Sequence, residues 1–334
     1  MLTLVGQFWA YAADRAKAPR RRAHPQPAAI VPIPVESFTP EQPHPKPKPK
    51  VVVRAPVKKA IHIAPKPRRQ PTVFSGLGAW VDQFDFANLD VARSIAIMSS
   101  NGVHTLYVQS GESSTTDAVL PDAGAWLVAA HEAGIKVVAW YLPHYSDMVL
   151  DVARTVAAAR YEYLGQRFDG VGVDIEYRRS VKGPDWMTRV AQHMALVRKA
   201  LGARYPIAAI PPPPLQMAVA PGYWAGFPWA SLGRSSSEIM LMAYWSARSD
   251  CPQNPSHCAY GYTKYDVLQA RALTGNRVPI HVIGGVGGQI TAADVTAFVK
   301  GARDAHADGA SLYDFATTDG AWWSTLRALR VLGR

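Results

Sequence analysis

Cysteine is scarce in this chain: the 334 residues contain only Cys251 and Cys258, both in one polar loop. Six residues separate them, so they could close a local disulfide, remain free thiols, or join His257 in binding a metal. Two thiols and one histidine leave a zinc site incomplete, because such a site takes four ligands. We therefore favour a disulfide, which would agree with an exported protein, and expect no bound metal.

Long apolar runs and phosphate-binding motifs are also missing. The apolar stretch Leu2–Ala13 is shorter than the roughly 20 residues that span a bilayer, and it lacks the basic start of a signal peptide. It fits the remnant of a signal if the true start lies upstream, so we expect an extracellular or envelope-associated protein. No P-loop or Rossmann spacing occurs, and we expect no cofactor. The glycines at 284–288 could cradle a phosphate, but a flexible turn is the simpler interpretation.

Acidic residues are scarce in the first 73 positions, where 14 Lys and Arg accompany only 3 Asp and Glu. The same segment holds 14 of the 27 prolines, and its net charge of +11 equals that of the whole chain. We therefore expect residues 1–73 to form a disordered Pro/Lys/Arg-rich linker, and residues 74–334 to form one globular domain. No aromatic residues interleave with these charges, so we expect contact with an anionic cell envelope and no nucleic-acid binding.

From residue 74 onward, apolar runs alternate with helical periodicity at a spacing of about 30 residues. Eight runs are predicted as strands buried on both faces: Leu77–Val81, Val103–Val108, Ile135–Leu142, Phe168–Ile175, Ile207–Ile210, Ile239–Tyr244, Val278–Ile283 and Ala310–Phe315. Seven intervals are predicted as helices: Val91–Ser100, Ala125–Ala133, Val149–Leu164, Trp186–Leu201, Tyr265–Leu273, Ala292–Ala305 and Trp322–Leu332. The interval between strands five and six is rich in Trp, Pro and Gly instead. The pattern predicts an α/β fold, a (β/α)8 TIM barrel, with a doubly wound sheet as the alternative.

The fourth predicted strand carries two carboxylates at its end, Asp174 and Glu176. Side chains alternate along a strand, so both point the same way and are separated by about 6.5–7 Å of rise. Each carboxylate therefore disfavours ionisation of the other, which helps one of them keep a proton. Active sites of TIM barrels lie at this end of the strands, so the pair is a candidate for acid catalysis.

Polar and aromatic residues gather at the other strand ends as well. Those that we expect to bind substrate are Trp80, Asp82, Gln109, Trp140, Tyr141, Trp245, Tyr313 and Asp314, and Tyr244 lies at the end of the sixth strand, either at the site or packed in the core. Aromatic rings stack on sugar C–H faces and the polar groups bind hydroxyls, so the set favours a carbohydrate. The aspartates could instead cap neighbouring loops, and the tryptophans could belong to the core. His281 lies within an apolar strand and is more typical of a core histidine.

The segment Asp169–Glu176 resembles the strand-four motif Asp-Gly-x-Asp-x-Asp-x-Glu of family 18 glycoside hydrolases, the chitinase-like barrels. Met242-Ala243-Tyr244 is similar to their strand-six Met-x-Tyr. The resemblance implies that Glu176 is the general acid, that Asp174 orients the substrate acetamido group, and that Tyr244 supports the same intermediate.

Two positions depart from that family pattern. Gly172 stands where the family has its middle aspartate, and Trp245 replaces the Asp or Asn that follows the tyrosine. The barrel as a whole also resembles glycoside-hydrolase-like barrels of actinobacterial exported proteins, through the stretches at 139–143, 243–245 and 311–314. Family 25 lysozyme-type barrels, which carry an Asp-x-Glu at a strand end, are a more distant likeness.

Two function classes follow. The first is a glycoside hydrolase acting on a polysaccharide or cell-wall glycan that contains N-acetylhexosamine, with Glu176 as its acid. The second is a non-catalytic carbohydrate-binding barrel. The missing middle aspartate favours the second class and the retained glutamate favours the first. We expect a monomer in either case.

Overall fold

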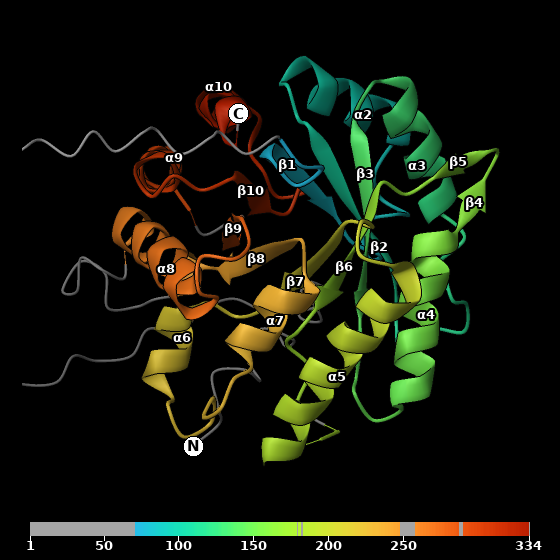
Figure 1. The fold of residues 1–334 in the computed structure, drawn as a ribbon. Helices are drawn as coiled ribbons and strands as arrows, with labels where there is room; N and C mark the ends of the chain where they lie inside the picture. The colour runs from blue at the N-terminus through green and yellow to red at the C-terminus, as the bar shows by residue number, and fades with distance from the viewer. Residues whose placement is uncertain (1–70, 179, 182, 248–257, 287–289, 334) are drawn as a thin grey trace, which may run out of the picture. The chain divides into compact units, whose positions relative to one another are not determined.

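The computed structural model describes residues 71–334, except 179, 182, 248–257, 287–289 and 334. Eight parallel strands close into a barrel in the order β1-β10-β9-β8-β7-β6-β3-β2 (Figure 1). The strands are β1 (Gly76–Val81), β2 (Thr105–Glu112), β3 (Lys136–Leu142), β6 (Gly170–Asp174), β7 (Ile207–Ile210), β8 (Glu238–Ala243), β9 (Ile280–Val286) and β10 (Gly309–Tyr313). The predicted (β/α)8 barrel is therefore confirmed.

The helices lie around the outside of this barrel (Figure 1). They are α2 (Val91–Ser100), α3 (Ala123–Glu132), α4 (Met148–Arg160), α5 (Gly183–Leu201), α6 (Pro214–Val219), α7 (Trp229–Ser235), α8 (Ala259–Leu273), α9 (Ala292–Asp304) and α10 (Trp323–Leu326). Side-chain caps start several of them: Asp90 accepts from the backbone N–H of Arg93, and Thr291 forms a capping box with Asp294.

Alternation along the strands sorts the apolar residues into two clusters. One face of each strand packs against the helices, for example through Val171, Val173 and Ile175. The other face fills the barrel with a smaller cluster: Phe74, Trp80, Tyr107, Val138, Trp140, Ala208, Ile210, Met240, Met242 and Ile283, with Val73, Tyr244 and Tyr313 packed against it. The interior is therefore a filled core whose upper layer forms the floor of the barrel mouth.

Three predicted elements differ from the observed ones. The helix predicted for Val149–Leu164 ends at Arg160, because β4 (Glu162–Tyr163) and β5 (Gln166–Arg167) form a hairpin. Its turn places both Leu164 and Gly165 at positive φ, which no helix permits. The interval between strands five and six folds into the short helices α6 and α7. The last predicted helix is divided into α10 and flanking 3-10 turns.

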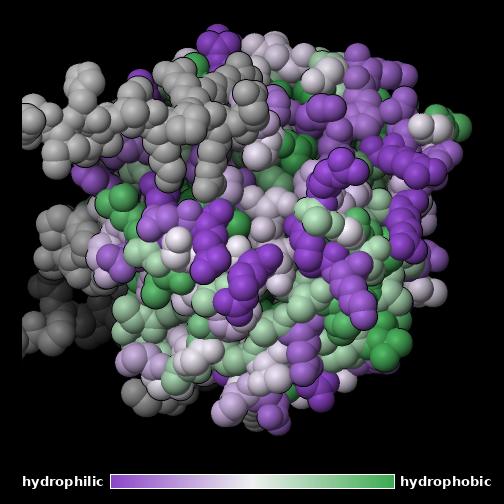
Figure 2. Space-filling model, viewed as in Figure 1, coloured by the Kyte–Doolittle hydropathy of each residue, from purple (hydrophilic) through white to green (hydrophobic). Residues whose placement is uncertain are grey.

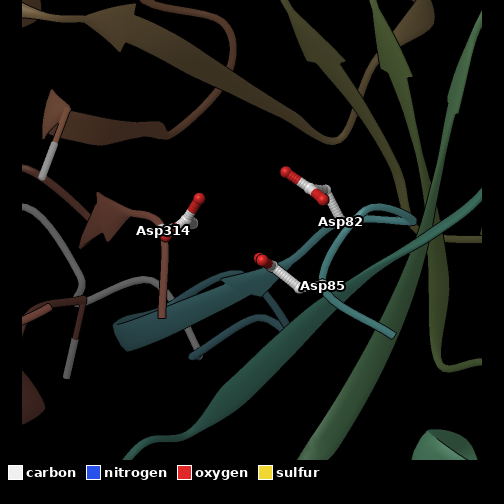
Figure 3. A group of neighbouring side chains, drawn as sticks. All are labelled: Asp82, Asp85 and Asp314. Carbon is white, nitrogen blue, oxygen red and sulfur yellow. The ribbon is translucent and has the colours of Figure 1, made fainter. Parts of the chain in front are cut away.

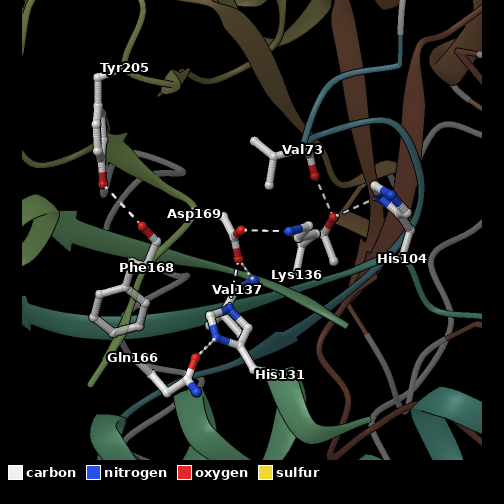
Figure 4. A network of polar contacts seen from close by, with 10 residues as sticks. Val73, His104, His131, Lys136, Val137, Gln166, Phe168, Asp169 and Tyr205 are labelled. Atoms are coloured by element: carbon white, nitrogen blue, oxygen red, sulfur yellow. Dashed lines mark hydrogen bonds and ion pairs between the residues drawn. The ribbon is translucent and has the colours of Figure 1, made fainter. Parts of the chain in front are cut away.

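The first aspartate of the strand-four motif closes the opposite, N-terminal end of the strands (Figure 4). Asp169 accepts hydrogen bonds from Nε2 of His131 at 2.8 Å, Nζ of Lys136 at 2.9 Å and the backbone N–H of Val137 at 2.9 Å. Burial alone would raise its pKa, but these bonds and the Lys136 charge lower the pKa of Asp169 below its usual value. This carboxylate therefore ties α3, β3 and β6 together.

Several sequence predictions fall outside the described residues. The predicted linker does so except for its last three positions, and the predicted disulfide involves Cys251, which also lies outside. Within the described part of the chain, no helix is long and apolar enough to cross a membrane. On the face seen in Figure 2, hydrophilic and hydrophobic side chains are interspersed.

Candidate active site

Asp174 is the last residue of β6, and Glu176 follows it by two positions at the C-terminal mouth of the barrel. The backbone N–H of Ile175, between them, donates to the carbonyl of Ile210 at 2.8 Å and fixes this turn of the chain. Asp174 is buried, with 8% of its surface exposed, and its Oδ1 has no hydrogen-bond partner among the described residues. Glu176 is partly exposed. The pair thus combines a buried carboxyl with one that substrate can reach.

The surroundings of Asp174 and Glu176 favour the protonated form of both carboxyls. Burial, reinforced by the Glu176 charge, raises the pKa of Asp174 well above its usual value. Burial raises the pKa of Glu176 to about 7. Two neighbouring carboxyls that are both disfavoured as anions share their protons, so one can act as an acid near neutral pH.

Two tyrosines extend the site across the mouth. The rings of Tyr244, which follows β8, and Tyr313, at the end of β10, have centroids 6.0 Å apart. Burial and the charges of Glu176, Asp174 and Asp314 raise the pKa of Tyr244, so its hydroxyl stays protonated and lies within electrostatic reach of all three. The Tyr313 hydroxyl donates to Oδ2 of Asp82 at 2.9 Å.

Three aspartates gather beyond these tyrosines (Figure 3). Asp82, Asp85 and Asp314 each place one carboxylate oxygen within 4.8 Å of the others. Oδ1 of Asp82 accepts from the backbone N–H of Phe84 at 2.8 Å, and burial raises the Asp82 pKa. Oδ1 of Asp314 accepts from the hydroxyl of Thr317 at 2.8 Å and from its backbone N–H at 2.9 Å. Three oxygens could hold a cation, but no second feature of the described residues points to one, so we assign no metal.

The floor of the mouth is aromatic. Trp80 and Trp140 are 2% and 5% exposed, and their ring centroids lie 6.0 Å apart in an edge-on arrangement. Both therefore lie in the core layer beneath the carboxylates, with little surface left for a sugar.

A buried histidine holds Trp80 in this layer. Nδ1 of His281 contacts the Phe74 carbonyl at 2.9 Å, and a carbonyl only accepts, so Nδ1 carries the proton. Nε2 of His281 then accepts from the Ser311 hydroxyl at 2.8 Å, and that hydroxyl accepts from Nε1 of Trp80 at 2.8 Å. Burial lowers the pKa of His281 to about 4, so it is neutral and structural.

A larger side chain at Gly172 would have to displace Ile210. A Cβ at this position would lie 2.8 Å from Cδ1 of Ile210 and 3.4 Å from Cβ of Trp140. The place of the family's middle aspartate is therefore occupied by apolar atoms, and Asp174 has no carboxylate beneath it.

The remaining predicted residues make contacts of their own. Tyr141 faces outward from the barrel and donates to Oδ1 of Asp151 at 2.8 Å. Trp245 stacks on Phe298 of α9, with centroids 4.9 Å apart, in the cluster outside the barrel. Gln109 is buried, and its Oε1 accepts from the backbone N–H of Gln83 at 3.0 Å, which supports the loop that carries Asp82.

Sequence patterns did not single out the two residues that follow Glu176. The Tyr177 ring stacks on His144 with centroids 3.9 Å apart. The Arg178 guanidinium lies 3.8 Å from the centre of the Tyr223 ring and 4.8 Å from that of Trp186. Their direct succession to the glutamate was the only available signal, because their partners His144 and Tyr223 are distant in sequence and Trp186 lies on the following helix.

No protein-family model matches this sequence, and no curated protein matches it either. Among solved structures, the chain is similar to a chitinase from Chromobacterium violaceum, with a TM-score of 0.55 and 13% identity over 76% of this chain and 98% of that one. It is also similar to a family 18 N-acetylglucosaminidase from Paenibacillus barengoltzii, with a TM-score of 0.55 and 11% identity over 76% and 99%. A third is the spore cortex-lytic enzyme SleL of Bacillus cereus, with a TM-score of 0.56 and 8% identity over 76% and 74%. The chitinase-like barrel expected from the motifs is thus confirmed as a fold.

Proposed function

We propose that this chain is a glycoside hydrolase acting on a polysaccharide, with Glu176 as its general acid. The observation that carries the proposal is the carboxyl pair at the end of β6. Burial raises the pKa of Glu176 to about 7, and Asp174 lies two residues before it. Glycoside cleavage needs a proton donor beside the leaving oxygen, and a carboxyl protonated near neutral pH meets that need.

We infer the roles of the other groups from the resemblance to the family 18 motifs. Glu176 donates its proton to the glycosidic oxygen as the bond to the sugar breaks. Asp174 and the Tyr244 hydroxyl hold an N-acetyl group of the substrate against the developing oxocarbenium-like centre. If the substrate has no such group, Asp314 has an oxygen without a described hydrogen bond that could serve as the second carboxylate.

The similar structures support a glycan as the partner. Their titles name chitinases, an N-acetylglucosaminidase and a spore cortex-lytic enzyme. We propose a polysaccharide or cell-wall glycan containing N-acetylhexosamine, met outside the cell or at its envelope. The basic segment before the barrel would adhere to anionic envelope polymers, and the protein would act as a monomer.

A carbohydrate-binding barrel without catalysis is the second candidate, and one observation favours it. Ile210 and Trp140 occupy the space beside Gly172, so the chain cannot restore the family's middle aspartate without rearrangement. In that case the same mouth would bind glycan fragments and leave them intact.

A glycan-hydrolysis screen of the full chain separates the two candidates. Chitin, chito-oligosaccharides and peptidoglycan are incubated with the wild type and with Glu176→Gln, which keeps the shape of the side chain but has no acid proton. Cleavage by the wild type that falls at least about 10²-fold in the variant supports the hydrolase. Binding of chito-oligosaccharides without cleavage by either protein supports the binding barrel.

A further inference from the structure

The position of the Glu176 carboxyl is set through its neighbours. Among the described residues, nothing forms a hydrogen bond with that carboxyl. The backbone is fixed instead one peptide group further away on each side. The N–H of Ile175 donates to Ile210, and the carbonyl of Tyr177 accepts from Nε1 of Trp186 at 2.7 Å. The backbone around the acid is thus held at two points from two different elements.

The Tyr177 side chain is held from the loop after β3. Its ring stacks on His144 with centroids 3.9 Å apart and planes inclined by 16°. The backbone N–H of His144 donates to Oγ of Ser113 at 2.7 Å, and Ser113 in turn donates to the buried carboxylate of Asp151. His144 is therefore a fixed surface against which the Tyr177 ring rests.

The next residue, Arg178, is held from the opposite side. It is 8% exposed, its guanidinium lies against the rings of Tyr223 and Trp186, and its Nη1 donates to the carbonyl of Tyr223. In the described part of the chain no carboxylate pairs with it. A cation that is buried among aromatic faces without an acidic partner acts as an anchor for its own backbone.

We propose that His144 and Arg178 are positioning residues that hold the Glu176 carboxyl at the oxygen of the bond to be cleaved. This inference rests on the proposed function. A carboxyl without hydrogen bonds of its own stays in position only if the backbone that carries it is fixed. A displacement of about 1 Å can reduce a rate by about 10²-fold. The two anchors act on consecutive residues from opposite sides, so together they fix both the position and the rotation of the segment.

The test is how strongly kcat depends on the leaving group of the substrate, because a general loss of structure would lower kcat for all leaving groups alike. The dinitrophenolate of a 2,4-dinitrophenyl glycoside departs with little need for protonation. The phenolate of a phenyl glycoside is a poorer leaving group and needs the proton of the acid. Both glycosides carry the sugar that the wild type cleaves, and all proteins are full chains. For His144→Ala we expect kcat on the phenyl glycoside to fall about tenfold or more, with a change under about twofold on the dinitrophenyl glycoside and in KM.

Matched variants complete the design. His144→Phe keeps a flat ring on Tyr177 and should recover most of the lost rate. Arg178→Met removes the guanidinium and should behave like His144→Ala. Tyr163→Ala removes a stacked ring from the β4–β5 hairpin, 6.5 Å from Tyr161, and should leave the leaving-group dependence unchanged. Glu176→Gln sets the reference pattern for complete loss of the acid.

Hydrogen exchange of the backbone amides at 175–178 gives a second measurement that needs no substrate. The inference predicts faster exchange in His144→Ala and wild-type exchange in His144→Phe. Equal losses on both glycosides, or unchanged exchange in His144→Ala, would overturn the inference and leave the proposed function standing. If Glu176→Gln shows no leaving-group dependence, or the wild type cleaves no glycoside, the proposed function fails and this inference with it.

Discussion

Asp169 and Asp174 belong to one motif and flank one strand, yet their surroundings are opposite. Asp169, at the N-terminal end of β6, has three hydrogen-bond donors and a lowered pKa. Asp174, at the C-terminal end, has a raised pKa and an oxygen with no hydrogen-bond partner in the described part of the chain. The N-terminal end of the barrel therefore stabilises the fold through a paired carboxylate. At the C-terminal end the ionised form of the carboxyls is disfavoured, which costs stability but suits acid catalysis.

The largest expected effect lies at the C-terminal end. Asp174→Asn should lower kcat on a cleaved glycan by about 10²-fold, because the group that holds the substrate against the developing charge becomes a weaker acceptor. Thermal unfolding at pH 8 should show no loss of stability, since the amide removes a buried carboxyl that resists ionisation. Steady-state kinetics and calorimetry measure the two effects. A variant that unfolds earlier but turns over normally would reverse the comparison.

The opposite result is expected for Asp169→Asn. Its neutral side chain leaves Lys136 and His131 with a weaker acceptor, so the free energy of unfolding at pH 7 should fall by about 2 kcal/mol. The kcat of the folded protein should be unchanged. Because folding lowers this pKa, the stabilising contribution is present at neutral pH and is lost as pH falls below about 4. Denaturant unfolding should therefore show the variant and the wild type converging in acid, and a constant difference would contradict this origin.

A substitution between the two aspartates sharpens the comparison. Gly172→Asp restores the family's middle carboxylate but forces its Cβ against Cδ1 of Ile210. We expect a loss of about 1–2 kcal/mol from overpacking. The double variant with Ile210→Val removes that Cδ1 atom and should recover part of the loss. Urea titration of the wild type, Gly172→Asp and the double variant decides it, and a freely tolerated Gly172→Asp would show that the floor rearranges.

The smallest effect is expected from removing residues 1–73. The charges of residues 74–334 balance, and of the described residues 71–73 only Val73 packs against the inner apolar cluster of the barrel. Thermal unfolding of residues 74–334 should match that of the full chain within about 1–2 °C. A midpoint lowered by several degrees would show that the removed segment packs on the barrel.

Local patterns predicted the strands well, because β-branched apolar runs buried on both faces are distinctive. Ile207–Ile210 was predicted with its observed bounds, and each of the other seven strands overlaps its predicted range. The pattern could not say which residues face the barrel interior, since that depends on strand register. Trp140 faces inward and its neighbour Tyr141 outward, whereas both had been assigned to the substrate.

The same limit applies to the acid site. Asp174 and Glu176 stand out because they end a glycine-bearing apolar strand. The contacts that hold them come from Ile210, Trp186 and His144. Ile210 and His144 are 30 or more residues away from Asp174, and Trp186 lies on the following helix. Such contacts follow from closure of the barrel and cannot be predicted from spacing along the chain.

The pH dependence of kcat for the wild type and Glu176→Gln tests the central claim most directly. The raised pKa of Glu176 means that its carboxyl is protonated below about pH 7 and loses the proton as pH rises through that value. The account predicts that wild-type turnover of a glycan declines above about pH 7, and that Glu176→Gln is at least about 10²-fold slower with no such decline. Wild-type turnover that rises through pH 7 to 9, or a Glu176→Gln variant as fast as the wild type, would contradict it.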